Sequence, residues 1–202
     1  MARTASARAD AAQRPSPVRE RILAAADEHF YAEGIRTVSA DRLIAEAGVS
    51  KVTFYRHFPS KDDLVLAYLA GRSALERHAL EQLRARAGDA CETLVAIARA
   101  VADMSCAPGF RGCPFLNAVA EYADPTHPVR QAVAAHRDWF AAFLGELLGE
   151  LGIDDRTRVA DQLVILRDGA MVGSYLSVDP ESRFDTIVGI GRAVIDTARG
   201  SR

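Results

Sequence analysis

The sequence has few cysteines and no long apolar run. Its three cysteines, Cys91, Cys106 and Cys113, are an odd number without a CxxC pair, so we expect reduced, structural thiols rather than disulfides or a redox switch. The longest apolar run, 64–70, is too short to cross a bilayer, so we expect no membrane partner. Residues 1–17 lack the apolar core of a secretory signal, which predicts a cytoplasmic protein.

Signatures of catalysis are also missing. The chain has no Gly-rich phosphate loop, no His–Cys–Asp spacing and no paired-carboxylate motif. An enzyme with a Cys or His nucleophile is therefore the weaker alternative, and we expect no enzymatic activity, no cofactor and no metal. Together, His127, His136, Asp124 and Asp138 fit scattered charges on a solvated helix face better than a metal site.

Charge is distributed unevenly along a chain of ordinary globular composition. Hydrophobic residues make up 49% and charged residues 26%, and the formal net charge is −2. Residues 1–61 carry 10 basic and 7 acidic side chains, a balance of +3, whereas residues 62–202 carry 15 and 20, a balance of −5. A basic head on an acidic body indicates that the head alone meets a polyanion such as DNA.

Helix signals dominate and strand signals are nearly absent. Ser16-Pro17 has the form of an N-cap followed by proline at the first helical position, and Asp179-Pro180 repeats it near the C-terminus. Apolar residues recur with helical spacing between such signals. We therefore predict an all-α fold of about nine helices, over residues 17–34, 39–47, 51–58, 60–86, 90–105, 114–122, 128–151, 155–178 and 179–198.

Residues 39–58 have the proportions of a helix-turn-helix. Gly48 permits the positive φ of a sharp turn, and Phe54 and Phe58 can hold the second helix against the first. The outward residues then suit base edges and phosphates of a major groove. An ordinary helical hairpin with a polar surface has the same spacing, so spacing alone leaves both readings open. The outward residues are Lys51, Val52, Thr53, Tyr55 and Arg56.

The run from Gly34 to Leu64 resembles the TetR-family DNA-binding domain almost position for position. The segments IAEAGVSKVTFYRHF (Ile44–Phe58) and SKDDL (Ser60–Leu64) are specific in combination. The resemblance is strong over residues 18–68, and beyond them only length, helix count and a C-terminal helix pair agree. Residues 109–118 also resemble a segment of many family members whose effectors are uncharacterised.

The resemblance implies a ligand-responsive transcriptional repressor. Such a protein binds double-stranded operator DNA of near-palindromic sequence as a homodimer, associates with the nucleoid when bound, and is released by a small-molecule effector, here expected to be apolar or aromatic. An architectural DNA binder without a ligand is the second alternative. The implied domains are a disordered arm (1–16), a helix-turn-helix DNA-binding domain (17–62) and a C-terminal helical bundle for ligand binding and dimerisation (63–202).

The resemblance also assigns DNA-contact roles by position. Tyr55 and Lys61 match phosphate-binding positions, and Ser50 is expected to cap the recognition helix near phosphate. Val52 suits contact with a thymine methyl. For His57, a packing role and a phosphate contact both remain open. The positions expected to contact DNA are Thr37, Arg42, Ser50, Lys51, Val52, Thr53, Tyr55, Arg56, His57 and Lys61.

Aromatic and sulfur-bearing residues gather in the C-terminal half. They fit either an effector cavity or a plain core, and Arg111, Asn117 and Arg167 are candidates for holding a polar end of a ligand. The expected ligand-binding residues are Met104, Phe110, Cys113, Phe115, Asn117, Trp139, Phe143, Arg167, Met171 and Tyr175.

The last two helices have apolar faces that are broad for a solvated surface, which predicts a dimer interface. Arg3, Arg8 and Arg14 lie in the N-terminal segment and are expected to form a mobile arm that adds phosphate or minor-groove contacts. The expected interface residues are Leu163, Leu166, Ala170, Gly173, Phe184, Ile187, Val188 and Val194.

Overall fold

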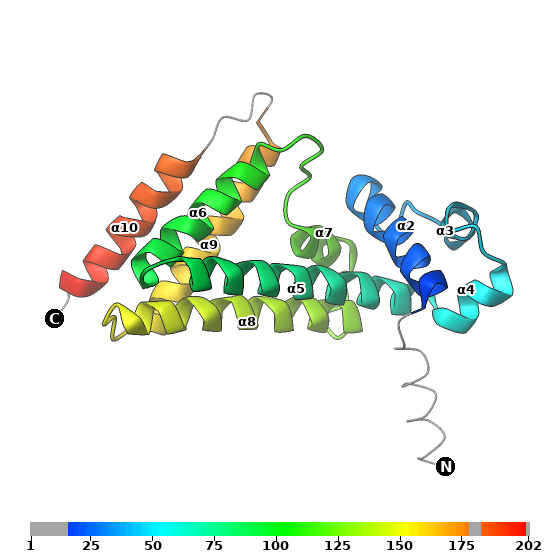
Figure 1. The fold of residues 1–202 in the computed structure, drawn as a ribbon, viewed down its shortest axis with the longest axis horizontal. Coiled ribbons are helices and arrows are strands. Elements are labelled where there is room, and N and C mark those ends of the chain that lie inside the picture. Colours follow the sequence, from blue (N-terminus) through cyan, green and yellow to red (C-terminus); the bar gives the residue numbers. More distant parts are fainter. Residues whose placement is uncertain (1–15, 178–182, 201–202) are drawn as a thin grey trace, which may run out of the picture. The chain divides into compact units, whose positions relative to one another are not determined.

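The structure, a computed structural model, describes residues 16–177 and 183–200, and every regular element in these ranges is an α-helix (Figure 1). The expected all-α fold is confirmed, and most helix ends agree with the sequence prediction within three residues. The helices are α2 (Pro17–Glu33), α3 (Ala40–Glu46), α4 (Lys51–His57), α5 (Lys61–Arg86), α6 (Ala90–Ser105), α7 (Pro114–Glu121), α8 (Pro128–Glu150), α9 (Arg156–Tyr175) and α10 (Phe184–Gly200).

Serine caps begin the first three of these helices. The side-chain oxygens of Ser16, Ser39 and Ser50 accept the backbone N–H three residues later, at 3.1, 3.2 and 3.1 Å. Each bond satisfies a donor that a helix start otherwise leaves without a partner. Pro17 follows its cap at the first helical position, as the sequence predicts.

The start of the last helix differs from the prediction. Arg183 is not helical and α10 begins at Phe184, so the helix does not run from Asp179-Pro180. A proline after a capping residue permits a helix at that point but does not require one. Residues 179 and 180, and the arm residues Arg3, Arg8 and Arg14, lie outside the described residues.

The chain forms two compact units. The first contains residues up to Arg72 together with 118–132, and the second contains 73–117 and the residues from Val133 onward. Helices α5, α7 and α8 each contribute residues to both units. Helices α3 and α4 therefore share their unit with the end of α7 and the start of α8.

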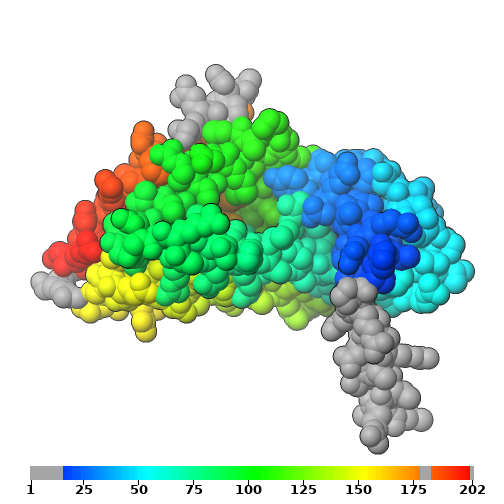
Figure 2. All heavy atoms as spheres, in the orientation of Figure 1, coloured from blue at the N-terminus to red at the C-terminus, as the bar shows by residue number. Residues whose placement is uncertain are grey.

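Each unit has its own apolar core. In the first, the predicted stripe of Ile22, Ala26 and Phe30 on α2 is buried. In the second, α6, α9 and α10 contact one another, and the atoms of α5 and α6 adjoin on the face seen in Figure 2. The main buried cluster of the second unit includes Leu80, Ile97, Phe140, Phe143, Leu144, Leu147, Leu148 and Val159.

No helix in the described ranges is long and apolar enough to cross a membrane.

Candidate functional site

Helices α3 and α4 form the predicted helix-turn-helix. Gly48 in the connecting turn has φ +62°, a conformation that L side chains rarely adopt. Phe54 and Phe58 are almost fully buried, with ring centroids 6.3 Å apart. The turn and the aromatic anchors thus act as the sequence indicates, and they hold α4 against the rest of the first unit.

The outer face of α4 is open to solvent. Val52 is 79% exposed, and Lys51, Tyr55 and Arg56 are also exposed. Thr53 is half-buried, and its hydroxyl accepts a hydrogen bond from Ser50 Oγ at 2.9 Å. A face with an apolar side chain beside cations and hydroxyls can contact both base edges and phosphates.

Two of the expected DNA-contacting cations already have carboxylate partners. Arg42 forms an ion pair with Glu33, and this hydrogen bond lowers the pKa of the Glu33 carboxyl and raises that of the guanidinium. Lys51 Nζ lies 3.4 Å from Asp41 Oδ1. A DNA phosphate would therefore have to displace or share these exposed carboxylates.

Lys61, the residue expected to bind phosphate from the start of α5, is half-buried. Its ammonium lies 5.9 Å from the centroid of the Phe30 ring. Burial lowers the pKa of the Lys61 ammonium, against the opposing effect of the Glu121 and Asp62 carboxylates. The Lys61 side chain is therefore partly packed against the first unit. Thr37, another expected phosphate contact, is exposed.

His57 is half-buried at the end of α4. Burial lowers the pKa of its imidazole, and the cations Arg56 and Arg19 lower it further. The ring is thus neutral at neutral pH in the free protein. A packing role and an N–H donated to phosphate both fit this state.

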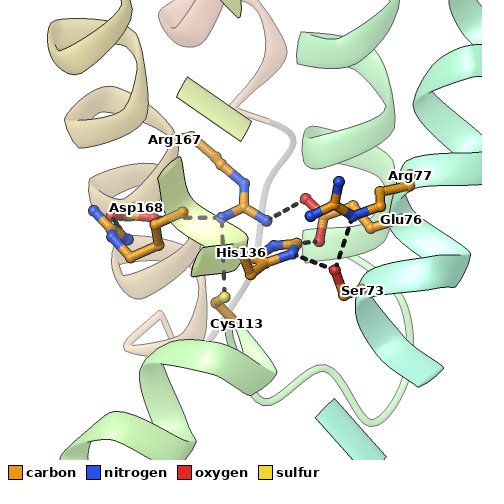
Figure 3. A network of polar contacts seen from close by, with 8 residues as sticks. Ser73, Glu76, Arg77, Cys113, His136, Arg167 and Asp168 are labelled. Atoms are coloured by element: carbon orange, nitrogen blue, oxygen red, sulfur yellow. Dashed lines mark hydrogen bonds and ion pairs between the residues drawn. The ribbon is translucent and has the colours of Figure 1, made fainter. Parts of the chain in front are cut away.

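The second unit contains a buried polar network that sequence reasoning mostly missed (Figure 3). Arg167 Nη2 donates to Glu76 Oε1 at 2.9 Å, and Nη1 lies 3.9 Å from Cys113 Sγ. Burial lowers the pKa of the Arg167 guanidinium, but the charge of Glu76 and the neighbouring Cys113 and Asp168 outweigh that effect and raise it. Burial raises the pKa of Glu76, but the hydrogen bond with His136 and the Arg167 charge hold it below its usual value.

His136 lies at the centre of this network. It is 3% exposed, its Nδ1 is 3.0 Å from Ser73 Oγ, and its Nε2 is 3.4 Å from Glu76 Oε2. Its ring stacks on Phe115, with centroids 3.6 Å apart and planes within 7°. The expectation that His136 lies on a solvated face is therefore wrong.

A signal for this burial was present in the sequence. His136 follows Val129 and Val133 and precedes Phe140 at helical spacing, so it occupies an apolar stripe of α8. Glu76 occupies the equivalent stripe of α5, between Leu69 and Leu80. A charged or imidazole side chain on such a stripe must find a buried partner.

The structure brings together only part of the expected ligand-binding set. Phe115 and Trp139 both contact His136, and the Trp139 ring centroid lies 5.5 Å from that of His136. The Phe143 ring centroid lies 6.0 Å from that of Trp139. Cys113 and Arg167 join through the polar network. Elsewhere, Met104 and Tyr175 are exposed, Phe110 is half-buried, Met171 is buried, and Asn117 donates to the backbone carbonyl of Arg111 at 2.8 Å.

An apolar cavity of about 100 Å³ lies among α6, α8, α9 and α10. Arg167 is the one expected ligand residue that lines it. Four of the expected dimer residues also line it, and the pocket is partly open to solvent. Its lining includes Leu94, Ala98, Val101, Phe140, Leu144, Leu163, Leu166, Ile187, Val188 and Ile195.

The most exposed apolar side chains of α9 and α10 are not among the expected interface residues. Ile165 and Leu176 are 68% and 75% exposed, and Val172 and Ile190 are nearly half exposed. Ile165, Val172 and the C-cap residue Leu176 are spaced seven and four residues apart, which makes a helical stripe along α9 and its end. Sequence reasoning did not use this signal. Of the remaining expected interface residues, Val194 packs on the core and Ala170, Gly173 and Phe184 are half-buried.

The remaining cysteine and metal candidates are separate in space. Cys91 is exposed, Cys106 half-buried and Cys113 buried, and all three are free thiols. Within the described ranges, no three His, Cys, Asp or Glu side chains are grouped as a metal site. His127 Nε2 lies 3.4 Å from Asp62 Oδ2 instead.

Comparison with known proteins agrees with this geometry. Residues 22–68 match the family described as bacterial regulatory proteins, tetR family. The chain is 45% identical to SCO4454, a TetR-family transcriptional regulator from Streptomyces coelicolor, over 90% of this chain and 95% of that one, with a TM-score of 0.84. It is 28% identical to a putative TetR transcriptional regulator from Streptomyces avermitilis, covering 91% and 99%, with a TM-score of 0.80. It is also 27% identical to the HTH-type transcriptional regulator LmrA of Bacillus subtilis, covering 72% and 79%. The chain belongs to the TetR family of DNA-binding transcriptional regulators.

Proposed function

We propose that this regulator is a repressor that binds a near-palindromic operator as a homodimer and leaves it when a small apolar or aromatic effector binds. The observation that carries the proposal is the exposed face of α4. Val52 and Arg56 are exposed on this helix. Ser50 caps the start of the helix, and the buried Phe54 packs it against the first unit. Such a face suits the major groove, where hydrogen-bond donors and methyl contacts distinguish base pairs.

The proposed dimer rests on the exposed apolar stripe of α9 and α10. Exposed apolar residues that recur along one helix face are typical of a protein interface. Pairing Ile165, Leu176 and Ile190 with their equivalents in a second copy would bury them in a four-helix interface. A two-fold pair would set two recognition helices about 34–36 Å apart, or at a similar whole-turn spacing, on a palindromic site.

The proposed effector site rests on the apolar cavity and the adjoining Arg167 network. At about 100 Å³, the cavity is smaller than the roughly 150 Å³ engineered cavity that binds benzene, so an aromatic effector requires some opening of the surrounding helices. The Arg167 side chain lines the cavity and supplies a donor for a polar end of the ligand. Such an opening gives the ligand a differential affinity for two conformations, which is what release requires.

Binding and assembly can be tested first. A duplex selected from a random DNA pool by the full-length protein is expected to be a near-palindrome, and sedimentation at micromolar concentration is expected to show a dimer. Ile165→Glu places a charge on the expected interface and should produce monomers with weaker operator binding. A stable wild-type monomer, or a selected site without symmetry, contradicts the proposed dimeric repressor.

Effector release can be tested with the single tryptophan, Trp139, which packs beside the core of the second unit. A ligand that quenches its fluorescence should release the selected duplex, and about 1–3 kcal/mol of coupling suffices for a several-fold to hundredfold change. Trp139→Phe should keep release while losing the signal. Ligands that bind tightly and leave operator affinity unchanged contradict the effector mechanism.

A further inference from the structure

Helix α7 ends at Glu121, and its residues from Ala118 onward belong to the first unit, which also contains the helix-turn-helix.

Glu121 holds the turn that leads into the helix-turn-helix. Its Oε1 accepts the backbone N–H of Ile35 at 2.8 Å, and its Oε2 accepts that of Arg36 at 2.6 Å. Gly34 has φ +93°, and a Cβ placed there would lie 3.2 Å from Glu121 Oε1. The two N–H groups and the glycine together fit a carboxylate, and charge-assisted bonds of this kind are stronger than neutral ones.

The residues after α7 hold the other end of the motif. Tyr122 Oη donates to Asp62 Oδ1 at 3.0 Å, and His127 Nε2 lies 3.4 Å from Asp62 Oδ2. Burial and the hydrogen bond to Asp62 raise the pKa of the Tyr122 phenol, so it remains a donor at all physiological pH values. Asp62 lies in the first turn of α5, next to Lys61. The segment 118–132 therefore contacts the chain both before α3 and after α4.

We propose that Glu121 is a positioning residue for DNA binding. The carboxylate fixes the Ile35–Arg36 turn through both of its oxygens, and this turn sets where α3 and α4 begin. The positioning role rests on DNA binding alone and involves no effector.

Removal of the carboxylate tests the positioning role. Glu121→Ala loses both hydrogen bonds and should weaken binding to the selected duplex at least about tenfold. Glu121→Gln keeps one acceptor oxygen and should fall between Glu121→Ala and the wild type. Because Glu121 lies near Lys61, loss of its charge by itself would strengthen binding to polyanionic DNA, which is the opposite sign.

Glu28→Gln is the matched control, since Glu28 is exposed on α2 in the same unit and loses the same charge. It should leave the ratio of selected-duplex to random-duplex affinity unchanged, while Glu121→Ala should reduce that ratio. Circular dichroism of each variant at the assay temperature shows whether it is folded. If folded Glu121→Ala binds the selected duplex as the wild type does, the positioning role is wrong.

Discussion

The two units of the molecule differ in how far their charged side chains are exposed to solvent. In the first unit, the cations expected to meet DNA lie at the surface and their carboxylate partners are exposed, as with Lys51 and Asp41. In the second unit, Arg167 and Glu76 are largely buried beside the fully buried His136. Exposed pairs contribute little to stability and exchange readily with a ligand, whereas a buried pair is costly to break. Binding is thus expected to depend on the first set and folding on the second.

The largest expected effect is on the stability of the second unit. Glu76→Ala leaves the Arg167 cation buried without its main partner and should lower the free energy of unfolding by roughly 3–5 kcal/mol. Urea unfolding followed by circular dichroism measures this. Glu81→Ala, an exposed site on the same helix, is the control and should change stability by less than about 0.5 kcal/mol. Equal stabilities of the two variants would show that the network is not structural.

The next largest expected effect is a loss of DNA affinity without a loss of stability. Arg56→Ala removes an exposed donor of α4 and should cost about 1–3 kcal/mol on the selected duplex, with relaxed preference at one base position and unchanged urea unfolding. Thr53→Ala should behave similarly at a different position. Titration against the duplex and its single-base variants measures both. An equal loss on selected and random DNA would contradict the base-reading role of either residue.

Lys61 should contribute to affinity and not to specificity. Lys61→Ala is expected to weaken binding to all sequences alike and to reduce the slope of log affinity against log salt by roughly one unit, because one phosphate contact is lost. Binding isotherms between low and moderate salt measure the slope. An unchanged slope would mean that the half-buried ammonium over the Phe30 ring serves the protein core and not the DNA.

How much of each unit could be predicted depends on the sequence separation between the residues that interact. Serine caps, the Gly48 turn and the apolar stripe of α2 are set by neighbours along the chain, so the helix-turn-helix was predicted closely. Glu76 and Arg167, which pair with each other, are 91 residues apart in sequence. No local rule pairs them, although the position of each charge on an apolar stripe could have indicated burial.

The α9–α10 pair shows the same limit. Both helices are apolar on more than one side, and periodicity alone does not say which side faces the core. The expected residues Leu163, Ile187 and Val188 line the partly open apolar pocket, whereas Ile165 and Leu176 face solvent. Only the packing of α6 against both helices distinguishes these sides. The hydrogen bonds from Ile35 and Arg36 to Glu121 could not be predicted from local rules either, because Ile35 and Glu121 are 86 residues apart.

The smallest expected effect concerns His57, whose packing and phosphate roles differ in their pH dependence. Its pKa is lowered in the folded protein, so between that value and about 6.5 the unfolded chain binds more protons than the folded one. The stabilising contribution is therefore complete above about pH 6.5 and is lost as the pH falls through the folded pKa. Thermal unfolding of the wild type and His57→Gln from pH 7.5 to 5 should show the wild type losing stability relative to the variant.

Operator binding over the same pH range separates the two roles of His57. With a packing role, which we expect because burial is the largest cause of the lowered pKa, the affinity ratio of wild type to His57→Gln should change little with pH. With a phosphate contact, the bound phosphate would favour the imidazolium, and the wild type would gain affinity steadily as the pH falls below about 6.5. A steep gain that is absent from His57→Gln would therefore assign His57 to the DNA-binding surface and remove it from the packing that holds α4.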